Sequence, residues 1–144
     1  MKILLLEDDC LQAESIRREL ERAFGMSCVE ELATESQFRA RLNTIARDPP
    51  DVAVLDVMVR WADPSPEPPE PPEDVRREKF YRAGLRCARL LAAQVPDVPI
   101  VLYSILHPDD LKSELPDLSP GVTHLPKKAE LRLLVDLIRR KAKR

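Results

Sequence analysis

Residues 2–9 read KILLLEDD, a short and almost unbroken apolar run that ends at acidic residues. A strand that is covered on both faces by helices reads as a continuous apolar run of this kind. Similar runs follow at 27–32 (SCVEEL), 51–58 (DVAVLDVM), 98–103 (VPIVLY) and 122–125 (VTHL). We expect each run to form a strand, the second lying at an edge and the last being brief.

The segments between these runs carry apolar residues at helical spacing. They predict helices at 10–24, from Thr34 or Ser36 to about 46, at about 74–95, at 108–115 and at 128–142. The long third helix is expected to bury Phe80 and Cys87 on one stripe. Strands that alternate with helices predict an α/β fold, a doubly wound five-stranded parallel sheet of order 2-1-3-4-5 with helices on both faces.

The bulk composition fits one domain over residues 1–144. The chain has 144 residues, of which 44% are hydrophobic, and a net charge of -2. This charge gives no reason to expect nucleic acid or an anionic membrane as a partner. No stretch has the length of a membrane span, and the first apolar run is too short for a signal peptide. Cys10, Cys28 and Cys87 form no CxxC pair, so buried reduced thiols in a cytoplasmic protein are the expectation.

Residues 64–72 (PSPEPPEPP) contain a dense run of prolines within an insert at 60–74. Proline lacks the N–H donor and fixes φ, which excludes a helix or a central strand here. The segment predicts an extended polyproline stretch or a loose, solvated loop; docking into an aromatic groove of a partner is the alternative. Trp61 and Tyr81 flank it and are expected to cover the core.

Polar residues follow the predicted strands at their carboxyl ends, where open parallel sheets place their chemistry. Residues 7–9 (EDD) follow the first strand, Asp56 ends the third, Ser104 ends the fourth and Lys127 follows the fifth. Clustered carboxylates repel one another, and a divalent cation with oxygen ligands, such as Mg²⁺, removes that conflict. A carboxylate nucleophile, a metal, an ammonium and a hydroxyl are the groups that stabilise a transferring phosphoryl group.

The order ILLLEDD, VAVLDVM, PIVLYS and THLPKK resembles the receiver domain of response regulators in two-component signalling, over residues 2–142. The resemblance implies a flavodoxin-like fold and a phospho-accepting regulatory domain rather than an enzyme. It assigns Asp8 and Asp9 to the acid pair that binds Mg²⁺, together with Asp56 and the backbone carbonyl of Met58.

The same resemblance assigns the phosphoryl chemistry. Asp56 matches the phospho-accepting aspartate, and Lys127 matches the lysine that contacts the phosphoryl group. Ser104 matches the switch hydroxyl, and His124 stands where the family has its aromatic switch residue. The implied phosphoryl donor is a phosphohistidine on a histidine kinase or a phosphotransfer protein.

Four positions depart from the family's pattern. Arg60 replaces a proline ahead of the insert, Ile105 replaces a small residue after Ser104, His124 replaces the aromatic residue, and Lys128 replaces the proline after the lysine. A cis bond before a non-proline residue is costly, so the loop after Lys127 is expected to be trans or rearranged. A bulky Ile105 is expected to narrow access to the phosphoryl group.

The leading hypothesis is therefore a receiver that switches protein–protein contacts on phosphorylation. The alternative is a receiver-like protein-binding module that never uses phosphate. A phosphohydrolase with an aspartyl nucleophile would need a DxD pattern after the first strand, which EDDC does not provide. Homodimerisation stays open, because the segment 108–115 offers only a short fourth helix.

Overall fold

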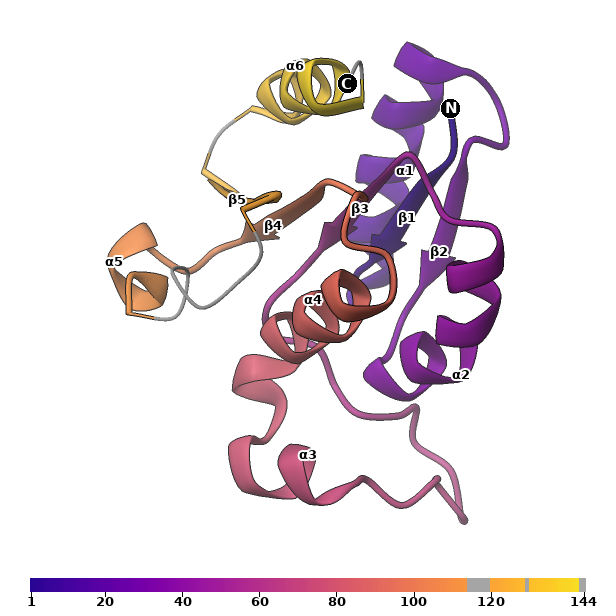
Figure 1. The fold of residues 1–144 in the computed structure, drawn as a ribbon, viewed down its shortest axis with the longest axis vertical. Helices are drawn as coiled ribbons and strands as arrows, with labels where there is room; N and C mark the ends of the chain where they lie inside the picture. Colours follow the sequence, from indigo (N-terminus) through magenta and orange to yellow (C-terminus); the bar gives the residue numbers. More distant parts are fainter. Residues whose placement is uncertain (114–119, 129, 143–144) are drawn as a thin grey trace.

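Five parallel strands form the sheet at the centre of the molecule (Figure 1). The computed structural model describes residues 1–113, 120–128 and 130–142. The strand order is β2-β1-β3-β4-β5, which confirms the predicted doubly wound order 2-1-3-4-5. The strands are β1 (Ile3–Leu6), β2 (Val29–Leu32), β3 (Val52–Leu55), β4 (Ile100–Ser104) and β5 (Val122–Pro126).

The register of the sheet brings the ends of its strands to one edge. Leu6, the last residue of β1, lies opposite Leu32 in β2 and Leu55 in β3. At the other side of β3, Leu55 lies opposite Leu102 in β4. Residues that directly follow β1 and β3 are therefore neighbours in space although they are far apart in the chain.

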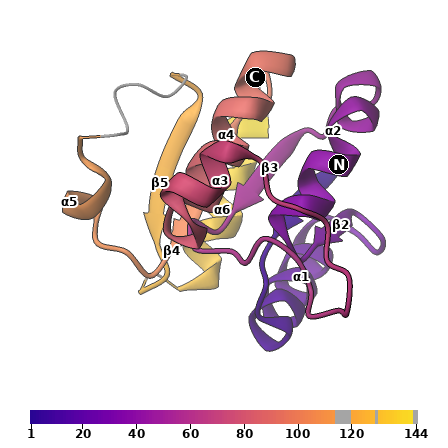
Figure 2. The same cartoon turned by 90° about the horizontal axis from the view of Figure 1, so that it is seen from below.

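Helices cover both faces of the sheet (Figures 1 and 2). α1 (Cys10–Phe24) and α6 (Leu131–Ala142) pack on one face, whereas α2 (Glu35–Arg47) and α4 (Ala83–Gln94) pack on the other. Alternate residues of β1 supply the two cores, with Ile3 on the α1–α6 face and Leu4 on the α2–α4 face. The short α5 (Pro108–Leu111) lies beyond β5, and its predicted continuation to 115 runs outside the described residues. No helix within the described ranges has the length and apolarity to cross a membrane.

The first two helices on these faces begin at side chains that cap them. The Asp9 carboxylate accepts hydrogen bonds from the N–H groups of Leu11 and Gln12, both at 3.0 Å. Thr34 caps α2 in the same way. Because these side chains satisfy N–H groups that have no partner within the helix, they fix where each helix starts. Cys10 stands at the exposed start of α1, so the expectation of a buried thiol is wrong there, whereas Cys28 and Cys87 are buried.

The single long helix predicted over 74–95 is wrong. The chain forms α3 (Glu73–Glu78), a 3₁₀ turn η1 (Phe80–Arg82) and then α4. Lys79 separates the first two pieces with a φ of 64°, outside the helical region. Asp74 of α3 pairs with Arg39, and Gly84 of α4 packs on the backbone after β3; the break at Lys79 lies between these two contacts. Phe80 and Tyr81 are consequently half exposed instead of covering the core.

The proline-rich insert is fastened to α2 at its start. The backbone N–H groups of Glu35 and Ser36 donate to the carbonyls of Arg60 and Trp61, at 3.1 and 2.8 Å. The indole N–H of Trp61 donates to the Pro69 carbonyl at 2.6 Å. Unpaired N–H groups at the start of a helix need acceptors, and the insert supplies them. The insert is therefore an extended segment with fixed ends, whose residues 63–70 are exposed.

A buried ion pair joins α2 to α4, and a partly exposed one joins α2 to α3. The Arg86 guanidinium donates to both carboxylate oxygens of Glu35, at 2.9 and 2.7 Å, and both side chains are almost completely buried. Arg39 pairs with Glu35 and also with Asp74 in α3. The two parallel hydrogen bonds between Arg86 and Glu35 replace the hydrogen bonds to water that both groups lose on burial. The network fixes α3, and with it the end of the insert, against the body of the fold.

Candidate metal and phosphoryl site

Three carboxylates gather at the carboxyl ends of β1 and β3. Oxygen atoms of Glu7, Asp8 and Asp56 lie within 4.8 Å of one another. Glu7 and Asp56 are buried, and Asp8 is half-buried. Burial, and then the nearby charge of Asp56, raise the pKa of Glu7 to about 7, although the hydrogen bond from Lys127 opposes that rise. Such a cluster of hard oxygen donors suits a divalent cation such as Mg²⁺.

Lys127 holds the two buried carboxylates together. Its ammonium group lies 2.8 Å from Glu7 Oε2, 3.2 Å from Asp56 Oδ2 and 2.6 Å from Gln12 Oε1. Burial lowers the pKa of Lys127, but the hydrogen bond to Glu7 and the charges of both carboxylates outweigh that effect and raise it. The ammonium is therefore a permanent positive charge beside Asp56. The structure brings Asp56 and Lys127 together, as the order of strands predicts.

The acid pair differs by one residue from the prediction. Asp9 caps α1 and is not a member of the carboxylate cluster within the described chain, whereas Glu7 is. Glu7 directly follows the last residue of β1, and its N–H donates to the carbonyl of Leu32. Asp is a strongly preferred helix-capping residue, and Asp9 stands directly before an amphipathic helix. That signal was available in the sequence, and it indicates Glu7 and Asp8 as the inward-facing acids.

Ser104 and Lys127 are joined through the backbone. The Lys127 N–H donates to the Ser104 carbonyl at 2.8 Å, which continues the β4–β5 pairing past the end of the sheet. The buried Ser104 hydroxyl accepts a hydrogen bond from the Leu106 N–H at 3.2 Å. The described chain has no cis peptide bond, so the expected trans bond between Lys127 and Lys128 is confirmed. A coordinating role of the Met58 carbonyl stays a prediction.

Gly84 packs directly against the backbone of the candidate phospho-acceptor. Its N–H donates to the Val57 carbonyl at 2.8 Å. A Cβ atom placed on Gly84 would lie 2.0 Å from the carbonyl oxygen of Asp56 and 2.7 Å from the Cα of Val57. The contact leaves no room for a side chain at this position, so the start of α4 fixes the position of the backbone at Asp56 and Val57. Sequence reasoning missed Gly84, because its environment is formed by residues distant in the chain.

His124 and Ile105 occupy different environments. His124 lies in β5 opposite Leu102, and both of its ring nitrogens are buried without a hydrogen-bond partner among the described residues. Burial, and secondly the charge of His107, lower the pKa of His124. Ile105 is 64% exposed. The expectation that Ile105 narrows the site stays untested, since this exposed fraction does not show where its side chain lies relative to Asp56.

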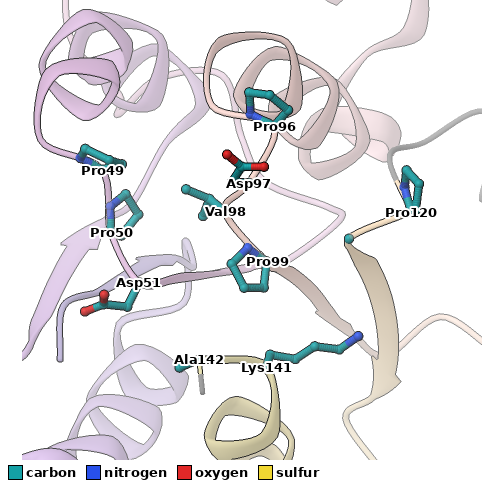
Figure 3. A pocket seen from close by; sticks show the side chains of 11 residues that line it. Pro49, Pro50, Asp51, Pro96, Asp97, Val98, Pro99, Pro120, Lys141 and Ala142 are labelled. Atoms are coloured by element: carbon teal, nitrogen blue, oxygen red, sulfur yellow. The ribbon is translucent and has the colours of Figure 1, made fainter. Parts of the chain in front are cut away.

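A hollow lined by prolines and charged groups lies at the opposite edge of the sheet. A cavity of about 380 Å³ is lined by prolines, including Pro50, Pro96 and Pro99, and by Asp51, Asp97 and Lys141 (Figure 3). Asp51 directly precedes β3, and Pro99 directly precedes β4. The cavity therefore lies at the amino ends of the strands, away from the carboxylate cluster. Its size does not make it the reactive site, because the candidate chemical groups lie at the carboxyl ends.

Comparison with known proteins identifies the fold. No family model matches the sequence, and no curated protein matches it. The solved CheY-like receiver domain from Methanospirillum hungatei is 16% identical, with a TM-score of 0.71 over 99% of this chain and 93% of that one. The BeF3-activated DrrB receiver domain is 20% identical, with a TM-score of 0.68 over 99% and 97% of the two chains.

A third neighbour carries a metal ion. The receiver domain of a sensor histidine kinase from Pseudomonas aeruginosa has a magnesium ion coordinated in its active-site cleft. It is 18% identical to this chain, with a TM-score of 0.69 over 99% of this chain and 98% of that one. The chain therefore has the flavodoxin-like fold of response regulator receiver domains. More particularly, it is a version of that fold with a proline-rich insert between β3 and α4 and with His124 on β5.

Proposed function

We propose that this protein is a signal receiver that accepts a phosphoryl group on Asp56. The observation that carries the proposal is the contact of the Lys127 ammonium with both Glu7 and Asp56 at the carboxyl ends of the strands. One oxygen of Asp56 accepts from the Val57 N–H at 2.7 Å, and the other accepts from Lys127. These two contacts orient the carboxylate for its role as a nucleophile.

The carboxylates of Glu7, Asp8 and Asp56 are proposed to hold Mg²⁺, with the backbone carbonyl of Met58 as a further ligand. Their oxygen donors and mutual repulsion fit such an ion. When bound, the ion would supply positive charge to the phosphoryl oxygens. The proposal does not include Asp9, since its carboxylate is used in capping α1.

The protein's own groups account for the remaining chemistry. A carboxylate oxygen of Asp56 forms the new bond to phosphorus while the bond between phosphorus and the donor's imidazole nitrogen breaks. Lys127 and the Ser104 hydroxyl would contact the phosphoryl oxygens and stabilise their charge. Movement of Ser104 toward the phosphoryl group, followed by His124, would then alter the surface around β5 and change protein–protein contacts. The chain would act as a regulatory domain and not as an enzyme with its own substrate.

The donor in this proposal is a phosphohistidine on a histidine kinase or a phosphotransfer protein. Its site of action would be the cytoplasm, where the free thiols of Cys10, Cys28 and Cys87 persist. Neither nucleic acid nor a membrane is proposed as a partner, since the net charge is only -2.

Intact-mass spectrometry after incubation with acetyl phosphate and Mg²⁺ tests the proposal. We expect the wild type to gain the mass of one phosphoryl group. Asp56→Asn should show no gain, because an amide is not a nucleophile of this kind, while Asp9→Asn should still gain the mass. A gain that persists in Asp56→Asn would place the acceptor elsewhere and contradict the assignment.

The second candidate is a phosphorylation-independent binding module with the same fold. It is favoured by the contacts of Lys127, whose ammonium already has three acceptors and so stabilises the acids without a metal. The unpartnered ring of His124 also differs from the family's aromatic switch. Absence of any mass gain, together with an unchanged melting temperature on addition of Mg²⁺, would establish this second function in place of the first.

A further inference from the structure

The insert and the segment after it present two exposed surfaces of opposite charge. We define the acidic proline surface as residues 64–73 and the basic aromatic surface as residues 77–82. Both lie at the end of the molecule where Figure 1 shows α3, away from the N-terminus and from α6. Glu73 begins α3 and Arg77 lies in its last turn, and the helix is fixed by the buried Val75 and by the pair between Asp74 and Arg39. α3 therefore fixes the placement of the two surfaces relative to each other within one copy.

The acidic proline surface has the form of a preformed ligand. Trp61 holds it through the Pro69 carbonyl, and Pro72 has the polyproline conformation, with φ of -68° and ψ of 170°. Glu70 pairs with Arg76, but Glu67 and Glu73 form no ion pair with any residue of the described chain. An extended proline segment loses little conformational freedom on binding, so it docks readily on aromatic side chains.

The basic aromatic surface has the features of a receptor for such a segment. Phe80 and Tyr81 are 48% and 50% exposed, and their ring centroids lie 4.1 Å apart. The turn at Lys79, with its φ of 64°, directs the chain so that the next two residues leave the core. Arg77 and Lys79 are exposed and have no ion-pair partner within the described ranges. Exposed aromatic pairs of this kind are typical of interaction sites.

The two surfaces complement each other in charge and in chemistry. Two unpaired carboxylates flank prolines on one surface, and two unpaired cations flank aromatic rings on the other. We propose that a second copy of this chain is the partner, with each copy placing its acidic proline surface on the basic aromatic surface of the other. A twofold axis satisfies both contacts at once, since one chain carries both halves. This interface is independent of phosphorylation at Asp56 and does not involve β5 or α6.

A charge-exchange experiment on the full chain tests the proposal. Sedimentation velocity is measured for the wild type, for Glu67→Lys/Glu73→Lys and for Arg77→Glu/Lys79→Glu, each alone and the two variants mixed. We expect the wild type to dimerise and each variant alone to dimerise at least about tenfold more weakly, because like charges then face each other. The mixture should regain the wild-type affinity, since every facing pair is again of opposite sign. Raising the salt from about 0.05 M to about 0.5 M should weaken the wild-type dimer.

A second variant separates the aromatic contribution from the charges. Phe80→Ser/Tyr81→Ser should weaken the dimer about tenfold or more, whereas Leu133→Ser, at an exposed residue of α6, should leave it unchanged. Thermal melts of all variants establish that they are folded. A wild type that is monomeric up to about 1 mM would overturn the proposal, as would a mixture no stronger than its components. Binding of a peptide of residues 64–73 to a chain that stays monomeric would assign the aromatic pair to a foreign acidic ligand, and would also overturn it.

Discussion

Replacing Gly84 by alanine is the sharpest perturbation of the candidate site. The new methyl carbon would lie 2.0 Å from the Asp56 carbonyl oxygen and 2.7 Å from its carbonyl carbon. Carbon and oxygen atoms in contact are normally more than about 3 Å apart, so α4 and the loop after β3 must separate by roughly 1 Å. Both obstructing atoms belong to the backbone, so no side chain can rotate away to relieve the overlap.

The expected loss of stability follows from three contributions. Overpacking of a tight contact costs about 1–3 kcal/mol, and weakening the hydrogen bond from Gly84 to Val57 adds about 1 kcal/mol. The better helix propensity of alanine offsets about 1 kcal/mol. The free energy of unfolding should therefore fall by about 2 kcal/mol. A displacement of about 1 Å at Asp56 should also slow phosphoryl acceptance by ~10- to ~100-fold.

Gly25→Ala provides a matched glycine control. A methyl group there meets nothing within 4 Å, but the φ of 113° is unfavourable for any residue with a side chain. This variant should lose about 1–3 kcal/mol in urea denaturation through backbone strain alone. Gly25 ends α1 beside the amino ends of the strands, whereas Asp56 lies at their carboxyl ends, so phosphoryl acceptance of this variant should equal that of the wild type. If Gly84→Ala unfolds at the wild-type urea midpoint and accepts phosphate at the wild-type rate, the positioning argument fails.

Further predictions concern the metal, the buried ion pair and the switch position. Mg²⁺ at about ten times its Kd should raise the Tm by roughly 3–5 °C. Asp8→Asn should abolish that rise in Tm, whereas Asp9→Ala should keep it. Asp9→Ala should instead lower the free energy of unfolding by about 1 kcal/mol, because the N-cap of α1 is lost. An equal response of the two variants to Mg²⁺ would contradict the exclusion of Asp9 from the metal site. Arg86→Met should cost about 3 kcal/mol, because it removes two hydrogen bonds from the buried Glu35 carboxylate and leaves only the partly exposed Arg39 as its ion-pair partner. Glu35→Leu/Arg86→Met should be much closer to the wild type in urea titration. The lowered pKa of His124 means that the folded state disfavours protonation of this ring, so the free energy of unfolding is unaffected by it above pH 6.5 and decreases as the pH falls below that value. His124→Phe should remove this part of the pH dependence of stability and raise the Tm. If the pH dependence is unchanged in the variant, the burial of the ring is contradicted.

The sheet could be predicted from local patterns alone. The runs ILLL, VAVL and IVLYS are apolar on both faces because helices cover both faces, so each run indicates a buried parallel strand without reference to the others. Placing Asp56 and Lys127 at one edge followed from the strand order, because the carboxyl ends of neighbouring parallel strands meet. These features depend on short stretches of chain and on the handedness of the crossovers, both of which the residues themselves specify.

Tertiary contacts decided the rest. Which of Glu7, Asp8 and Asp9 lie beside Asp56 depends on the register of β1 against β3, and Glu7 and Asp8 are the two whose carboxylates cluster with Asp56. The division of 74–95 at Lys79 arises because α3 is held by Arg39 while α4 is held by the Asp56 loop at Gly84. Helical periodicity reports only which residues one face would bury. It contains no information about partners that lie elsewhere in the chain, and it is these partners that fix the insert, the site and the exposed aromatic pair.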